Sequence, residues 1–127
     1  MLYRPVRWNY FYDNDGQPII RLIRKLTKLR RGGPQFSDGQ HYFYNDYSNF
    51  NSKGLMAFSR QLGNTFSLIV VNFTDQPQIT SFSFPVSGEY VEQIEGAQNL
   101  AAIVAGTAQA LTVPSNYGCI WTVTGGT

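Results

Sequence analysis

The amino-acid sequence predicts a mainly β protein, an antiparallel β-sandwich of about eight strands preceded by one amphipathic α-helix. Three observations support this prediction: a helical apolar period over 17–31, two strand-like runs folded about a turn within 54–75, and short strand-like runs that recur about every ten residues. The chain has 127 residues, 43% hydrophobic and 15% aromatic. That is enough for one ordinary domain with its own core.

The helix is predicted over 17–31. Its apolar residues recur at spacings of three and four, which places them on one side; we call them the apolar stripe: Ile19, Leu22, Ile23, Leu26 and Leu29. Six basic residues lie mostly on the other side: Arg21, Arg24, Lys25, Lys28, Arg30 and Arg31. The turn Asp13-Asn14-Asp15-Gly16 offers capping carboxylates at the start, and Gly32-Gly33-Pro34 ends the helix.

The central hairpin is predicted within Gly54–Asp75. The run 66–73 is almost continuously apolar and β-branched, so both of its faces should be covered and it belongs in the middle of a sheet. The run 55–61 alternates as a half-buried strand does. Between them, Gly63-Asn64 is expected to supply the positive φ angles of a tight turn.

Further strands are predicted at 41–47, 78–84, 89–94, 100–104, 109–113 and 118–124. Alternation predicts that one set of side chains points inward: Phe58, Leu68, Val70, Phe82, Phe84, Val91, Leu111, Val113 and Trp121.

The charge is unevenly distributed. The formal net charge is +2, yet all ten Lys and Arg lie between Arg4 and Arg60. Such a split is compatible with a nucleic-acid surface. The basic helix lacks the interleaved aromatic residues of nucleic-acid binders, so we expect its charges to face water and expect no nucleic-acid partner. No apolar run approaches the twenty residues of a membrane span, and no secretory signal precedes the helix, so a soluble chain is expected and its compartment stays open.

No catalytic residue, metal ligand or cofactor is expected in this chain. His41 and Cys119 are single and far apart, and the turn 13–16 lacks the glycine and glutamate spacing of an EF-hand. The eight acidic residues are predicted to lie in turns or on outer strand faces. Asn72-Phe73-Thr74 is formally a glycosylation sequon, but we interpret it as the end of a strand.

The hairpin carries a family resemblance. Gly54-Leu55-Met56-Ala57-Phe58-Ser59-Arg60, followed by Leu68-Ile69-Val70-Val71-Asn72-Phe73-Thr74-Asp75, resembles the signature that opens the C-terminal β-domain of α-amylase family glycoside hydrolases. Ile20-Arg21, Leu26 and Leu29-Arg30-Arg31 resemble the last helix of the (β/α)8 barrel in these enzymes. Gly88-Glu89-Tyr90, Ala110-Leu111-Thr112-Val113-Pro114 and Gly118-Cys119-Ile120-Trp121 resemble the later strands, and Arg4-Pro5-Val6-Arg7-Trp8 resembles a stretch after the last barrel strand.

The resemblance implies a domain organisation and a role. Residues 1–33 would be the tail of a barrel with its last helix, and 34–127 a C-terminal Greek-key β-sandwich. The chain would then be a non-catalytic domain that stabilises the barrel of an α-amylase-like hydrolase or transglycosidase acting on α-glucans. The family's catalytic aspartates and glutamate lie at barrel strand ends, which this chain does not contain.

Two alternatives stay open. One is an independent starch- or glycogen-binding module that stacks sugars on aromatic residues, with Trp8, Tyr42 and Tyr44 as candidates; strand alternation, however, separates Phe43 from Tyr42 and Tyr44. The other is nucleic-acid binding by the basic helix. If the barrel is missing, the apolar stripe loses its cover, and we expect it to pack on its own sandwich or on a second copy as a homo-oligomer.

Overall fold

The computed structural model describes residues 14, 16–44, 53–94 and 99–124. Along these residues the main elements are, in order, α1 (Gly16–Gly32), α2 (Pro34–Ser37), β1 (Gln40–Tyr44), β2 (Leu55–Leu62), β3 (Thr65–Asn72), β4 (Gln78–Ser83), β5 (Gly88–Glu92), β6 (Leu100–Ile103), β7 (Ala108–Val113) and β8 (Gly118–Thr124). The predicted helix and strands are confirmed, apart from shifts of one or two residues at their ends and from 45–47, which lie outside the described residues. The short helix α2 was not predicted.

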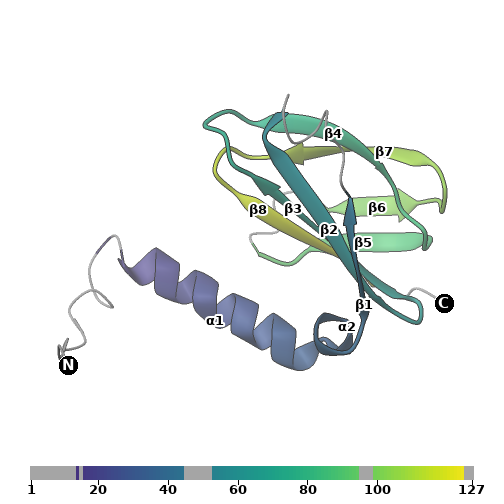
Figure 1. The fold of residues 1–127 in the computed structure, drawn as a ribbon, viewed down its shortest axis with the longest axis horizontal. Coiled ribbons are helices and arrows are strands. Elements are labelled where there is room, and N and C mark those ends of the chain that lie inside the picture. The colour runs from purple at the N-terminus through teal and green to yellow at the C-terminus, as the bar shows by residue number, and fades with distance from the viewer. Residues whose placement is uncertain (1–13, 15, 45–52, 95–98, 125–127) are drawn as a thin grey trace.

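The strands form two antiparallel sheets, visible in Figure 1. One sheet has six strands in the order β1-β2-β3-β8-β5-β6, and the other consists of β4 and β7. The pairings are nested, because β3 pairs with β8, β4 with β7 and β5 with β6. The chain from β3 to β8 is therefore one long hairpin that crosses from sheet to sheet, which is a Greek-key arrangement.

The main core lies between the two sheets. Its largest fully buried side chains come from both of them and include Trp121, Tyr90, Phe66, Phe84, Leu68, Leu111, Val70 and Val113. Fully burying a large apolar side chain contributes about 1.5–3 kcal/mol. This shared core confirms the predicted mainly β sandwich.

Two predicted inward positions are wrong. Leu55, Ala57 and Ser59 of β2 lie on the side of the strand that faces the main core. Phe58 alternates with them and therefore points to the other face of the sheet, where it packs in a separate apolar group. Val91 of β5 is half-buried and flanked by the buried side chains of Tyr90 and Glu92. Side chains alternate between the two faces of a strand, so Tyr90 and Glu92 point inward and Val91 points outward. The prediction had assigned the two faces of β5 the wrong way round. The other seven predicted positions are buried or half-buried against the main core.

The β2–β3 turn needs only one positive φ angle. Gly63 has a φ angle of 59°, whereas the φ angle of Asn64 is not positive. Positive φ at the first central residue alone is the pattern of a type II′ turn, which suits the twist of a hairpin. The expectation that both residues would supply positive φ was wrong.

Candidate functional site

The helix α1 leaves most of its apolar stripe uncovered. Ile19, Leu22, Ile23 and Leu26 keep 57%, 40%, 53% and 40% of their surface exposed. Figure 1 shows α1 extending away from the sandwich, with only its C-terminal end beside α2. Leu29 alone among the stripe residues packs against the sheet. The expectation that the stripe folds onto its own sandwich is therefore wrong for its first four members, and cover by a second copy stays a prediction.

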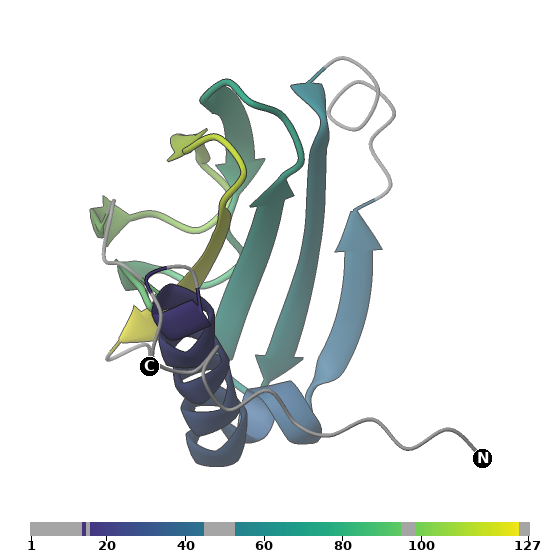
Figure 2. The same ribbon diagram turned by 90° about the vertical axis from the view of Figure 1, so that its left-hand side faces the viewer.

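The outer face of the six-stranded sheet carries a second apolar group, which we call the outer cluster. It consists of the buried Ile69, Ile94 and Ile120 with five partly buried side chains against them: Leu29, Phe36, Phe58, Val71 and Tyr117. Figure 2 shows α2 at the foot of the neighbouring strands β1, β2 and β3, with α1 in front of the sheet. Both faces of β3 are thus covered along 66–70, but Phe73 is 61% exposed, so the prediction of cover over the whole of 66–73 is wrong at its end.

Hydrogen bonds fix the two helices to this face. The buried Gln35 of α2 donates from Nε2 to Ser67 Oγ at 3.1 Å, and Ser67 Oγ lies 2.8 Å from Thr122 Oγ1. The Lys25 ammonium of α1 donates to the carbonyl of Ile94. The first two contacts join α2, β3 and β8, and the third joins α1 to the segment that follows β5.

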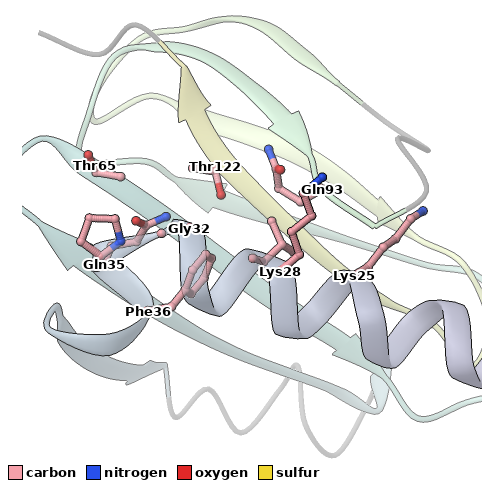
Figure 3. A pocket seen from close by; sticks show the side chains of 11 residues that line it. Lys25, Lys28, Gly32, Gln35, Phe36, Thr65, Gln93 and Thr122 are labelled. Atoms are coloured by element: carbon pink, nitrogen blue, oxygen red, sulfur yellow. The ribbon is translucent and has the colours of Figure 1, made fainter.

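A cleft of about 640 Å³ opens between the helices and the sheet (Figure 3). The lining combines lysine, amide and hydroxyl groups with the ring of Phe36, and it consists of Lys25, Lys28, Leu29, Gly32, Gly33, Pro34, Gln35, Phe36, Thr65, Gln93 and Thr122. The cleft can donate and accept hydrogen bonds. None of these described lining residues is an acid, a histidine or a cysteine, so they do not provide the pair of carboxyl groups that glycoside hydrolysis uses.

A second, more apolar pocket of about 310 Å³ also contains Phe36 in its lining. Its apolar lining is formed by Leu26, Leu29, Phe36, Phe58, Ile69 and Ile120, and its polar lining by Arg30, His41 and Arg60. Arg60 donates to the carbonyl of Phe36 at 3.0 Å and to that of Gln35 at 3.3 Å. Arg30 donates to the same Phe36 carbonyl at 3.4 Å. Two guanidinium groups therefore meet at one carbonyl oxygen.

Glu92 is a buried carboxylate that sequence reasoning placed wrongly on an outer face. It is 3% exposed, and its Oε1 accepts hydrogen bonds from the backbone N–H groups of Ile94 and Ile120, both at 3.0 Å. These amides explain how a charged group is tolerated inside the sandwich. Of the other acids, Asp38, Asp75 and Glu89 lie as predicted in turns or on an exposed strand face, and Asp13, Asp15, Asp46 and Glu95 are outside the described residues.

The single cysteine and the single histidine lie in different surroundings. Cys119 is buried, and desolvation together with the negative charge of Glu92 raises the pKa of its thiol to about 12. His41 is exposed, with its ring 5.4 Å from that of Phe58. Within the described ranges, no three His, Cys, Asp or Glu side chains gather in a way that could hold a metal ion.

The aromatic candidates for sugar binding do not make a flat platform. Tyr42 is 62% exposed, but its ring is tilted by 59° to that of Tyr44, 4.8 Å away. Tyr44 is half-buried, donates to Ser59 Oγ at 3.1 Å and packs edge-on against Phe82. Trp8 lies outside the described residues. Sequence reasoning missed the clefts beside Phe36, because α2, which carries that residue, has no periodic signal.

No protein-family model and no curated protein matches the chain. Among solved structures, an Anoxybacillus α-amylase matches with a TM-score of 0.68 and 16% identity, over 84% of this chain and 22% of that one. AmyP E221Q in complex with maltotriose matches with a TM-score of 0.72 and 13% identity, over 91% of this chain and 22% of that one. The fold is that of a segment of α-amylases.

A third match, the MutB D200A mutant in complex with glucose, has 29% identity and a TM-score of 0.55, over 80% of this chain and 17% of that one. The resemblance to α-amylase family glycoside hydrolases is thus confirmed at the level of the fold. The chain spans only about a fifth of the length of the proteins it matches.

This α-amylase-like segment does not assemble the chemistry of glycoside hydrolysis in its described residues. That reaction uses two carboxyl groups on either side of the scissile bond. Neither pocket beside Phe36 has an acid among its described lining residues, and Glu92 faces backbone amides. Neither described helix is both long and apolar enough to cross a membrane.

Proposed function

We propose that this chain is the non-catalytic C-terminal domain of an α-amylase-like glycoside hydrolase acting on α-glucans, and that it stabilises the catalytic barrel. Residues 1–33 would form the tail of the barrel with α1 as its last helix, and 34–127 the sandwich domain. The observation that carries the proposal is the uncovered apolar stripe of α1, on a chain whose fold matches about a fifth of larger α-amylase structures.

The exposure of the stripe supports an intramolecular partner. Ile19, Leu22, Ile23 and Leu26 stay exposed, and fully burying each would contribute about 1.5–3 kcal/mol. A contiguous apolar patch on an otherwise charged helix marks an interaction surface. Of the basic residues of α1, Lys25 donates to the carbonyl of Ile94, and Lys25 and Lys28 line the cleft beside the sheet. A barrel would therefore cover the side of the helix that carries the exposed stripe.

Catalysis in the proposed parent would come from carboxylates outside this chain. The parent reaction would be hydrolysis or transfer at α-glucosidic bonds. The neighbouring structures include an α-amylase complexed with acarbose, AmyP complexed with maltose and with maltotriose, and MutB complexed with glucose, all of which are far longer than their matched segment.

Two assays test the proposal. The chain alone, incubated with soluble starch or maltooligosaccharides, should release no new reducing ends, because neither pocket beside Phe36 has a carboxyl group among its described lining residues. In the parent enzyme, deletion of 34–127 should shorten the half-life of starch hydrolysis on heating without removing activity at low temperature. Turnover by the chain alone, or an unchanged half-life after the deletion, would contradict the proposal.

An independent carbohydrate-binding module is the second candidate, and the cleft in Figure 3 is the observation that favours it. Gln93 and Thr122 offer hydrogen-bonding groups in the same cleft as the apolar ring of Phe36, a combination that suits a sugar. Calorimetric titration with maltooligosaccharides distinguishes the two. Saturable heat at millimolar ligand, abolished by Phe36→Ala, would favour the binding module; no heat would favour the structural domain.

A further inference from the structure

The pocket that contains Arg30 and Arg60 holds two positive charges close together. Arg60 extends from β2 and Arg30 from the end of α1, and α2 brings them together because both donate to its Phe36 carbonyl, at 3.0 and 3.4 Å. A carbonyl is a neutral acceptor, so it leaves the repulsion between the two guanidinium groups in place. No carboxylate of the described residues forms an ion pair with either arginine, and none lines the pocket.

Apolar side chains around the two arginines favour the binding of an anion in this pocket. The pocket also contains Ile69 and Ile120, both nearly buried, and the half-buried Phe58. Arg60 is half-buried, and a charge in such a place interacts more strongly than one in water, because the local dielectric constant is lower. Each guanidinium has five N–H donors, so donors remain beyond the three recorded bonds. A carboxylate would fit this fork with charge-assisted hydrogen bonds.

The pocket is also continuous with the apolar stripe. Leu26 and Leu29 belong to the stripe and line the pocket as well. A surface that covers the stripe therefore reaches the pocket without a gap. This continuity identifies the occupant, because the body proposed to cover the stripe is the barrel of the parent chain.

We propose that the Arg30–Arg60 pocket receives the carboxylate of an aspartate or glutamate side chain from the barrel, and that this ion pair is the charged anchor of the interface between barrel and sandwich. The inference rests on the proposed function and adds to it the chemistry of the partner group. The apolar stripe supplies area, and the paired arginines fix the register in which the two bodies meet.

Single substitutions in the whole parent enzyme test the anchor. Arg30→Met and Arg60→Met keep most of the side-chain volume and remove the charge. The matched control is Arg24→Met, because Arg24 is an exposed cation of the same helix that does not line this pocket. Each anchor variant should lower the folded-to-unfolded ratio of the parent about tenfold, and the control should change it less than about twofold. Raising the salt concentration should reduce the difference.

A double-mutant cycle identifies the acid. Each barrel aspartate or glutamate is changed to its amide, alone and with Arg60→Met. One acid should lose stability in the wild-type background and have almost no further effect in the Arg60→Met background, and Arg30→Met should show the same coupling. Because Arg60 also holds the α2 carbonyls, the exposed Arg30, with its single recorded contact, separates loss of the anchor from loss of α2.

The outcomes separate this inference from the proposed function. If barrel and sandwich unfold independently and no stripe variant affects the barrel, the proposed function fails. If they unfold together but Arg30→Met behaves like Arg24→Met, or every acid adds independently to Arg60→Met, the proposed function stands and the carboxylate anchor is overturned.

Discussion

The Glu92 carboxylate and the backbone N–H of Ile120 form a 3.0 Å hydrogen bond inside the sandwich. The same Oε1 atom accepts from Ile94, so one buried side chain satisfies two main-chain donors next to the β5–β8 pairing. Glu92 is therefore a structural acid rather than a candidate for proton transfer to a substrate.

Glu92→Ala should lower the free energy of unfolding by about 3 kcal/mol, because two buried backbone donors lose their acceptor. Glu92→Gln keeps an oxygen at the same place and should cost under about 1 kcal/mol. Urea denaturation of the three proteins measures the difference. Equal losses for Ala and Gln would show that the negative charge, rather than the acceptor geometry, is what matters.

Asn72 closes the end of β3 through its side-chain amide. Its Nδ2 donates to the carbonyls of Gln76, Val113 and Pro114 at 2.9–3.1 Å, and its Oδ1 accepts from Thr74. Asn72→Asp should destabilise the chain by about 3 kcal/mol, since a buried carboxylate would face carbonyl oxygens. Asn64→Asp, in the exposed turn, is the matched control and should change stability by less than about 0.5 kcal/mol in thermal denaturation. Similar losses for both would refute this role.

Three glycines form a graded series. A Cβ at Gly54 would lie 2.4 Å from Thr74 Cγ2 and would require φ of +66°; a Cβ at Gly63 would meet nothing within 4 Å but still require φ of +59°; a Cβ at Gly32 would meet nothing and needs no positive φ. Substitution by alanine should thus cost most at Gly54, about 2–4 kcal/mol, about 1 kcal/mol at Gly63 and almost nothing at Gly32. Chemical denaturation tests this order, and a larger loss at Gly32 than at Gly54 would contradict it.

Stability should fall at alkaline pH because of Cys119. Its thiol pKa is raised from the ordinary 9.0 to about 12, so above pH 9 the unfolded chain loses a proton that the native chain retains. The thiol's contribution is therefore complete below pH 9 and declines between pH 9 and 12, by at most about 1.4 kcal/mol per pH unit. Burial also raises the pKa of Tyr90, which adds to the decline above pH 10.

The Cys119→Ala variant isolates this effect. Its unfolding free energy, measured by urea denaturation between pH 8 and 10, should lose the part of the slope that the wild type shows above pH 9. Identical slopes in the two proteins would contradict the assignment to Cys119. A native thiol that reacts with iodoacetamide at pH 8 as fast as in the urea-unfolded chain would do so as well.

Apolar periodicity predicted the helix, the eight strands and most of the core, because the main core is formed by alternating side chains of regular strands. Periodicity failed on β5, where Glu92 is buried through the amide of Ile120, 28 residues away. It also missed α2, since four residues after a proline show no period. Arg30 and Arg60 lie close together because both donate to the Phe36 carbonyl of α2, so a sequence pattern that missed α2 could not predict the pocket.

The central claim is that the apolar stripe of α1 is covered by a catalytic barrel in the parent enzyme. Thermal unfolding of the parent, with Ile23→Glu compared with Arg24→Glu at an exposed basic residue outside the apolar stripe, tests it most directly. We expect Ile23→Glu to lower the unfolding midpoint of the barrel by several degrees, and Arg24→Glu to leave it nearly unchanged. A barrel midpoint unaffected by Ile23→Glu would contradict the account.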